Sequence, residues 1–169
     1  PRAGAPACQS CHGDISRMRG VDALYPKRVG GELRNLDDQI NRCRQDRQGS
    51  APWAAESRPL LSLSLAVAHP SRGLPIAVDP AKDLHADLEA GRQLFRQRMG
   101  QIHLSCANCH DERWGQKLAG VTIVQGHPTG YPIYRLEWQG VGSLERRIRN
   151  CMNAVRAEPF APGALPVRQ

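Results

Sequence analysis

The residues in this chain that are best suited to chemistry form two C-x-x-C-H motifs, one at residues 8–12 and one at residues 106–110. This spacing is typical of covalent c-type haem attachment, in which two thiols add to the vinyl groups of one porphyrin and the adjacent histidine reaches the iron. The motifs predict two covalently bound haem c groups and a protein that handles electrons. The expected attachment and iron-binding residues are Cys8, Cys11 and His12 in the first motif, and Cys106, Cys109 and His110 in the second.

An internal repeat connects each motif to one further cysteine. In both halves a Tyr-Pro pair precedes a segment with Leu, Ile and Cys at i, i+4 and i+7, which is one face of a helix. The two segments are residues 35–43 and 143–151, and they begin with Asn35 and Ser143, which are suited to N-cap positions. Each half is therefore predicted to contain a haem motif, a loop and a helix that turns one cysteine inward.

The two remaining cysteines, Cys43 and Cys151, lie far enough after the motifs for the chain to pass round a haem edge to its other face. We interpret each as the distal thiolate ligand of its own haem iron. Three alternatives remain open: a Cys43–Cys151 disulfide, zinc binding by the C-x-x-C pairs, and methionine ligation by Met18 or Met152. The equivalent placement of the cysteines in the two halves favours thiolate ligation, because the two methionines are not equivalently placed.

The two repeated helices differ four residues before the cysteine, where the first has Gln39 and the second has Arg147. Residues i and i+4 share a helix face, so we expect Arg147 to lie beside Cys151. A guanidinium there lowers the thiol pKa and can hold a small oxyanion through a forked pair of hydrogen bonds. The alternative is a solvated basic face shared with Arg146 and Arg149. We take Cys151 and Arg147 as candidate catalytic residues, and assign the first haem a structural or electron-storing role.

Composition and length favour a mainly α fold of two tandem cytochrome c-like domains, with long haem-wrapping loops and little strand. A chain of 169 residues suffices for two small domains, whose cores each haem would supplement with apolar surface. The net charge of +7 accompanies no nucleic-acid-binding motif, and no apolar run approaches a membrane span. Haem attachment to C-x-x-C-H is normally completed outside the bacterial cytoplasm, so a periplasmic location is expected.

We place the two domains at residues 1–77 and 78–169, with the boundary in a turn-rich stretch near 75–80. Comparison of the two halves predicts that the first domain lacks an N-terminal helix and the second a C-terminal helix, so the chain is expected to be a fragment of a longer precursor. Further expected elements are helices over 60–68 and 81–100 and short ribbons over 121–124 and 134–138.

With these features together, the chain resembles the SoxA family, the di-haem cytochrome subunits of SoxAX complexes in bacterial Sox sulfur-oxidising systems. The resemblance is strongest over residues 94–155, and residues 69–76 are similar to the stretch between the family's two domains. The motifs that carry it are Cys106-Ala107-Asn108-Cys109-His110-Asp111, Gly126-His127, Gly130-Tyr131-Pro132-Ile133-Tyr134-Arg135-Leu136 and Arg147-x-x-x-Cys151.

This resemblance implies an L-cysteine S-thiosulfotransferase that joins thiosulfate oxidatively to a cysteine of the carrier protein SoxYZ. Two electrons would leave through the haem of a SoxX subunit, the heterodimer partner, to a small acceptor cytochrome c. Cys151 matches the family's active-site cysteine, which is often found as a persulfide, and Arg147 matches its neighbouring arginine. Two other functions stay open: a di-haem electron-transfer protein without substrate chemistry, and a redox or sulfur-compound sensor. Arg147 beside Cys151 favours the enzyme.

Overall fold

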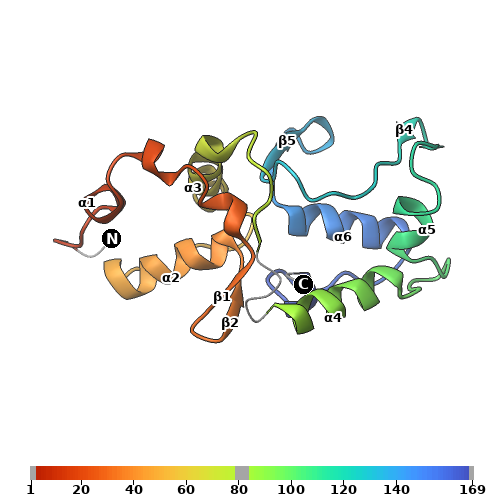
Figure 1. The fold of residues 1–169 in the computed structure, drawn as a ribbon, viewed down its shortest axis with the longest axis horizontal. Coiled ribbons are helices and arrows are strands. Elements are labelled where there is room, and N and C mark those ends of the chain that lie inside the picture. The colour runs from red at the N-terminus through yellow and green to blue at the C-terminus, as the bar shows by residue number, and fades with distance from the viewer. Residues whose placement is uncertain (1–2, 79–83, 168–169) are drawn as a thin grey trace.

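Helices separated by long loops make up both halves of the chain in the computed structural model, which describes residues 3–78 and 84–167. Figure 1 shows the two halves side by side, the N-terminal half in red to yellow and the C-terminal half in green to blue. The α-helices are α1 (Cys8–His12), α2 (Leu36–Gln48), α3 (Arg58–Ala68), α4 (His85–Arg96), α5 (Cys106–His110) and α6 (Leu144–Ala154). The 3₁₀ turns are η1 (Ile15–Met18), η2 (Asp22–Leu24), η3 (His69–Ser71), η4 (Leu136–Trp138) and η5 (Leu165–Val167).

The two predicted repeat helices are confirmed as α2 and α6, and their N-caps are the predicted residues. The side-chain carboxamide oxygen of Asn35 accepts a hydrogen bond from the Asp38 N–H at 2.8 Å, and Asp38 accepts one in return from the Asn35 N–H at 3.0 Å. The Ser143 hydroxyl accepts the Arg146 N–H at 3.1 Å. These caps satisfy backbone N–H groups that the first helical turn leaves without a partner.

The other two expected helices are also present. The helix predicted at 60–68 is α3, which begins two residues earlier with a proline in its first turn. The helix predicted over 81–100 is shorter: α4 spans His85–Arg96, and the start of the expected range lies outside the described residues. The proposed domain boundary near 75–80 likewise falls partly outside them.

Strands are few and form three separate two-stranded antiparallel hairpins in the described residues. They are β1 (Lys27–Val29) with β2 (Glu32–Arg34), β3 (Lys117–Leu118) with β4 (Val121–Thr122), and β5 (Ile133–Arg135) with β6 (Gly140–Gly142). The ribbon expected over 121–124 is present as the shorter β4. The prediction over 134–138 is wrong beyond Arg135, because Arg135 pairs with Gly140 and the intervening residues form the hairpin loop that contains η4.

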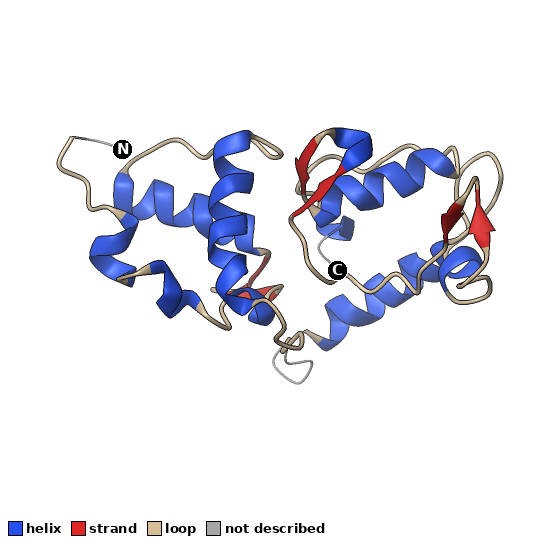
Figure 2. Ribbon diagram, turned by 90° about the horizontal axis from the view of Figure 1, so that it is seen from above, coloured by secondary structure: helices blue, strands red, loops and turns tan. Residues whose placement is uncertain are grey.

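The N-termini of α2 and α6 meet at the contact between the two halves. The Asn35 side-chain amide donates to a carboxylate oxygen of Glu145 at 3.1 Å, and the Ser143 N–H donates to Glu56 at 3.4 Å. From this junction the two helices extend in opposite directions, as both views show (Figures 1 and 2). The two cysteines carried by these helices therefore lie on opposite sides of the junction.

A second contact between the halves is an ion pair from β1 to α4. The Arg28 guanidinium donates two hydrogen bonds to the carboxylate of Asp87, at 2.8 and 2.9 Å, and the Asp87 side chain is only 7% exposed. Paired geometry of this kind is stronger than a single exposed ion pair. It joins the hairpin of one half to the first helix of the other.

Few apolar side chains are fully buried, and they fall into two small groups. The buried apolar residues of the described chain are Leu33, Leu60, Leu61 and Val67 in the first half, and Leu84, Ala107 and Met152 in the second. Cores this small suit domains that a bound prosthetic group completes. No helix among the described residues has the length and apolar character needed to cross a bilayer.

Candidate functional site

The second C-x-x-C-H motif is held in place by its own helix cap. The Ser105 N–H donates to the Asn108 side chain at 3.0 Å, while the Asn108 N–H donates to the Ser105 hydroxyl at 3.3 Å. Asn108 also donates to Glu112 at 2.8 Å. Because Ala107 and Asn108 are buried, α5 packs through the two variable positions of the motif. Cys106 and Cys109 are both half-buried.

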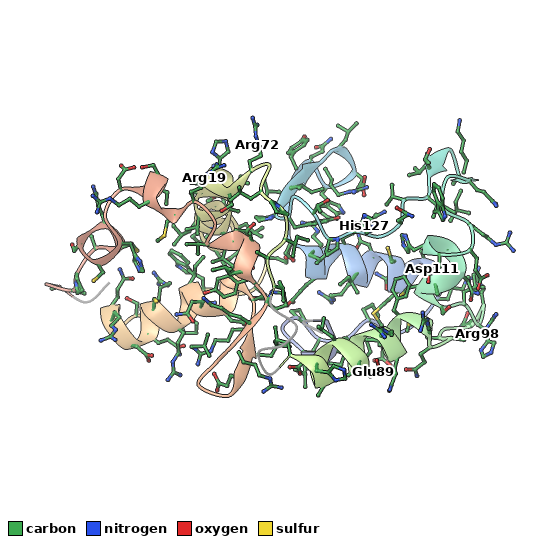
Figure 3. All side chains as sticks on the ribbon, in the orientation of Figure 1. Arg19, Arg72, Glu89, Arg98, Asp111 and His127 are labelled. Carbon is green, nitrogen blue, oxygen red and sulfur yellow. The ribbon has the colours of Figure 1, made fainter. Side chains whose placement is uncertain are left out.

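The ring of His110 is oriented by two backbone features. Its Nδ1 lies 2.6 Å from the carbonyl oxygen of Val124, so Nδ1 carries the proton and Nε2 is the nitrogen left to bind a metal. Gly126 has φ +76°, and a Cβ there would lie 3.2 Å from the imidazole. A glycine is therefore required beside this ring. The next residue, His127, lies above α6 in Figure 3.

His110 faces Cys151 of α6, which brings together the two residues predicted to bind the second iron. A hydrogen bond between them is the largest influence on both: it raises the pKa of His110 and lowers the pKa of Cys151. Phe95 of α4 lies alongside, with its ring centroid 6.4 Å from that of His110. An oriented imidazole opposite a thiolate, next to two half-buried thiols, is a donor set that fits a covalently attached haem.

Arg147 lies one helical turn before Cys151, as predicted, and its charge contributes to the lowered pKa of that thiol. The other two arginines of α6 have different surroundings. The Arg146 guanidinium lies 4.6 Å from the centre of the Trp138 ring, and the Nε of Arg149 is buried. The three therefore do not form one solvated basic face.

Two further charged residues lie at this site, and the sequence reasoning missed both. Glu137 accepts hydrogen bonds from Arg135 at 2.7 and 3.3 Å, and one of its oxygens lies 3.6 Å from the Arg147 guanidinium. The charge of Arg135 also lowers the pKa of Cys151, and the Arg135 hydrogen bonds lower the pKa of Glu137. Alignment of the two Tyr-Pro pairs could have pointed to Arg135, because the equivalent residue of the first half is the uncharged Val29.

The first motif is more open than the second. Cys8, Cys11 and His12 are all exposed, and no side chain caps α1. Cys43 is half-buried on α2, where the Gln39 amide donates to its sulfur at 3.5 Å. No hydrogen bond joins His12 to Cys43 within residues 3–78. The structure therefore pairs the predicted ligands His110 and Cys151 directly in the second half, and no equivalent hydrogen bond is found in the described part of the first.

A further contact ties the first motif to the end of α2. Gln48 donates to the carbonyl of Pro6 at 3.1 Å and to the Cys8 sulfur at 3.8 Å. The helix that carries Cys43 therefore reaches the start of the motif with its last turn, and this contact places both at one end of the first half.

The structure does not support a Cys43–Cys151 disulfide or a zinc site. No disulfide joins Cys43 to Cys151, and the two cysteines lie in helices that diverge from a common junction. At ~1.5 Å per residue each cysteine is about 12 Å from its own helix start, well beyond the ~7 Å Cα separation that a disulfide bridges. The described residues contain no group of three or more acidic, His or Cys side chains arranged for a metal ion such as zinc. Met152 lines a cavity with Leu94, Met99 and Phe160.

Comparison with known proteins gives the same pattern of two units. A family model described as the SoxA/TsdA cytochrome c domain matches residues 2–76 and again residues 90–164. The predicted fold class of two tandem cytochrome c domains is therefore confirmed. Because a cytochrome c domain binds its haem through thioether bonds, the match also implies covalently bound haem c.

Curated relatives and a solved structure agree with this match. The chain is 34% identical to the L-cysteine S-thiosulfotransferase subunit SoxA of Rhodovulum sulfidophilum, covering 94% of this chain and 56% of that protein. It is 33% identical to the subunit of the same name from Pseudaminobacter salicylatoxidans, covering 90% and 54%. The crystal structure of SoxXA from P. pantotrophus aligns with a TM-score of 0.91 at 29% identity, covering 96% of this chain and 62% of that one.

The chain thus spans about half the length of the curated relatives that it matches. Within that span, both matched segments include a C-x-x-C-H motif followed by one of the repeated helices. The sequence, the fold and the family model agree, and the chain belongs to the SoxA/TsdA cytochrome c domain family.

Proposed function

We propose that this chain is the di-haem cytochrome c subunit of a thiosulfate-oxidising S-thiosulfotransferase. The observation that carries the proposal is the placement of the Cys151 sulfur against His110, with Arg147 one helical turn away. The first half has Gln39 where the second has Arg147, so only one of the two sites has this combination. The names of the curated relatives, L-cysteine S-thiosulfotransferase subunits, support the same activity.

Each domain holds one haem c in this proposal. In the first domain, residues 1–77, Cys8 and Cys11 would attach the haem, and His12 and the predicted distal ligand Cys43 would bind its iron. In the second domain, residues 78–169, Cys106 and Cys109 would attach the haem, and His110 and the predicted distal ligand Cys151 would bind its iron. When bound, the haem supplies a one-electron acceptor beside the sulfur of Cys151.

Cys151 and Arg147 carry the substrate chemistry. Arg147 holds the sulfonate oxygens of thiosulfate through its guanidinium, while the Cys151 sulfur, or its persulfide, engages the outer sulfur. The hydrogen bond from His110 and the nearby arginine charges lower the pKa of Cys151, which favours the reactive thiolate form of this sulfur. The thiolate of a carrier-protein cysteine then attacks the outer sulfur of thiosulfate, so that a new S–S bond forms to the carrier, the bond to the Cys151 sulfur breaks, and that sulfur leaves as its anion.

The overall reaction balances as an oxidation by two electrons. One carrier thiol and one thiosulfate dianion give a carrier cysteine S-thiosulfonate, one proton and two electrons. One S–S bond forms between the carrier sulfur and the outer sulfur of thiosulfate, and the thiol S–H bond breaks. The electrons pass to a small acceptor cytochrome c.

The proposed partners follow from the family. These are a SoxX cytochrome subunit in a heterodimer, the SoxYZ carrier protein and the acceptor cytochrome, with a periplasmic location for all of them. The structural match to a SoxXA complex supports the heterodimer. Thioether attachment of haem outside the bacterial cytoplasm supports the location.

The test is thiosulfate coupling by the full-length holo complex, produced in a host that attaches haem. We expect thiosulfate to be joined to the carrier cysteine, with two electrons appearing in the acceptor per conjugate. Arg147→Ala should lower kcat/KM for thiosulfate by about 10- to 100-fold, the loss expected for hydrogen bonds to a charged group. Arg92→Ala, which removes an exposed arginine from α4, is the control.

Two results would contradict the proposal. If thiosulfate neither reduced the acceptor nor appeared on the carrier, the chain would be a di-haem electron-transfer protein without substrate chemistry. If coupling occurred but Arg147→Ala kept full activity and thiosulfate affinity, the role of Arg147 would be wrong.

A further inference from the structure

A carboxylate lies between two guanidiniums beside Cys151. Arg135 ends strand β5, Glu137 lies in η4 and Arg147 lies on α6, so three separate elements meet here. One Glu137 oxygen is 2.7 Å from the Nε of Arg135 and 3.6 Å from the Arg147 guanidinium, and the other is 3.3 Å from Arg135. Two cations share a single anion, so the group retains excess positive charge.

The carboxylate is the most exposed member of this group. The Glu137 side chain is 49% exposed, against 34% for Arg147 and 24% for Arg135. Exposed ion pairs contribute little net free energy, so Glu137 can swing away into solvent at small cost. The two arginines are held more firmly, and Arg135 also lies 5.4 Å from the centre of the Trp138 ring. A ligand anion that arrived from solvent would therefore displace Glu137 rather than the arginines.

Neither arginine position is repeated in the first half, where the cation near Gln39 is instead Arg34 of β2, which donates to Gln39 at 3.2 Å and to Glu32. Strands β1 and β5 each follow a Tyr-Pro pair, and the residue equivalent to Arg135 at the end of β1 is Val29. The residue equivalent to Arg147 on α2 is Gln39. The hairpin and the helix therefore form in the first half with other residues at these two positions, so the scaffold itself does not require Arg135 and Arg147 there.

We propose that Arg135 is the second guanidinium of an oxyanion site beside Cys151, and that Glu137 is a built-in competitor that occupies this site until an anion displaces it. The ligand is a tetrahedral oxyanion such as a sulfonate or sulfate. This inference rests on the proposed function, since it gives the sulfonate end of thiosulfate two guanidinium partners instead of one. Two guanidinium groups carry the charge needed to neutralise a dianion. The single carboxylate of Glu137 neutralises only one of these two positive charges.

The carboxylates of a haem propionate have the same anionic chemistry, and they are the other possible source of a ligand for Arg135. The two sources differ in what each substitution would change. An arginine that binds a propionate affects haem incorporation and the reduction potential, whereas an arginine that binds a free anion affects the dissociation constant of that anion.

The experiment measures thiosulfate and sulfate binding to the oxidised, full-length holo complex by calorimetry. Arg135→Ala should weaken thiosulfate binding by about 10-fold, the effect of losing one charge-assisted contact. Glu137→Gln should have the opposite effect and tighten binding by about 3-fold or more, since the competing charge is gone while size and shape are kept. Sulfate, which cannot be coupled, should follow the same order.

Matched controls come from the exposed Arg92–Glu89 pair on α4, whose charged atoms lie 3.6 Å apart. Figure 3 shows Glu89 on the side of α4 that faces away from α6. Arg92→Ala and Glu89→Gln remove the same charges at a distance from the site, so both should leave the dissociation constants within about twofold of the wild-type value.

Several results would overturn the inference. Weaker or unchanged binding in Glu137→Gln would mean that Glu137 orients Arg147 and does not compete with the anion. A changed haem content or reduction potential in Arg135→Ala, with unchanged anion affinity, would assign Arg135 to a propionate. If Arg135→Ala failed to fold, Glu137→Gln would still decide the question, and Arg135→Lys would keep the charge. Sulfate binding with this pattern, but without thiosulfate coupling, would contradict the proposed function and leave the oxyanion site standing.

Discussion

The two halves of this molecule contain the same elements in the same order but differ in the packing of the motif helix and in the residues around the cysteine. Both have a C-x-x-C-H helix, a hairpin after a Tyr-Pro pair, and a capped helix with a cysteine on its third turn. In the second half the motif helix is capped and packed, and His110 meets Cys151. In the first half the motif helix is exposed and uncapped. Both halves thus share one scaffold that carries a cysteine on the repeated helix, whereas the neighbouring charges and the packing of the motif helix differ between them.

The largest difference is expected when the distal cysteines are removed one at a time. In the oxidised holo complex, electron paramagnetic resonance should show low-spin ferric signals of the histidine/thiolate type from both haems. Cys151→Ala should remove one signal and reduce thiosulfate coupling to the uncatalysed background, because both the iron ligand and the reacting sulfur are lost. Cys43→Ala should remove only the other signal and have a much smaller effect on coupling.

Equal losses of activity in these two variants would contradict the division of roles between the halves. Histidine/methionine or bis-histidine signals in the wild-type complex would show that neither cysteine binds iron. Haem content, measured on each variant, is the control for incomplete maturation.

A smaller effect is expected when the second site is given the residue of the first. Arg147→Gln reproduces the arrangement at Cys43, where Gln39 lies one turn earlier and donates to the sulfur. The variant keeps a hydrogen-bond donor but loses the positive charge, so kcat/KM for thiosulfate should fall by about 10-fold or more. Steady-state kinetics with Arg92→Gln as control measure this. An unchanged kcat/KM would mean that charge at this position has no role.

The helical framework was predictable from local signals, because caps and periodic apolar residues act over a few residues. The segments after Asn35 and Ser143 form the expected helices, and Arg147 falls one turn from Cys151 as helical spacing requires. Contacts made by the folded chain were not predictable in this way. Glu137 reaches Arg147, and Arg135 reaches Glu137, only in the folded chain, where the loop of the β5–β6 hairpin lies beside α6. The ribbon expected over 134–138 likewise ends at Arg135, because residues 136–138 form η4, which Gln139 closes with φ +45°.

The role of Cys43 and Cys151 could also not be predicted fully from local sequence signals. Their helical positions followed from spacing, but a disulfide between them stayed possible on sequence grounds. The meeting of α2 and α6 at their N-termini, which sends the cysteines in opposite directions, depends on cross-half contacts such as Asn35 to Glu145. Such a pairing, between residues far apart in the chain, has no signature in either segment alone.

Substitution of the residue that precedes each motif helix is expected to change the free energy of unfolding by about 1 kcal/mol. Ser105→Ala removes the hydroxyl that accepts the Asn108 N–H and should lower the free energy of unfolding of the holo protein by ~1 kcal/mol. Ala7 occupies the same position before α1, with an extended backbone that suits a cap. Ala7→Ser should therefore raise stability by about 0.5–1 kcal/mol. Denaturant unfolding of both variants measures this. A loss in Ala7→Ser would show that α1 is not held by local capping.

The smallest effect concerns the acidic residues at equivalent places in the first turns of α2 and α6. Glu145 on α6 reaches across to Asn35, whereas Asp37 on α2 turns inward and accepts a hydrogen bond from the buried Ser64 hydroxyl. Burial raises the pKa of Asp37 above 3.8, and the charge of Asp37 in turn helps to raise the pKa of Asp22. The folded chain thus holds these protons more tightly than the unfolded chain does.

It follows that their contribution to stability is fully present below pH 3.8 and is lost as the pH rises through the raised pKa values of Asp37 and Asp22. Asp37→Asn can still accept from Ser64 but no longer ionises. We expect the difference in free energy of unfolding between the variant and the wild type to be near zero in acid and to favour the variant increasingly towards neutral pH. Urea unfolding across this range measures it. A difference that favours the wild type at neutral pH would mean that attraction between the Asp37 charge and the N-terminus of α2 outweighs the cost of burial.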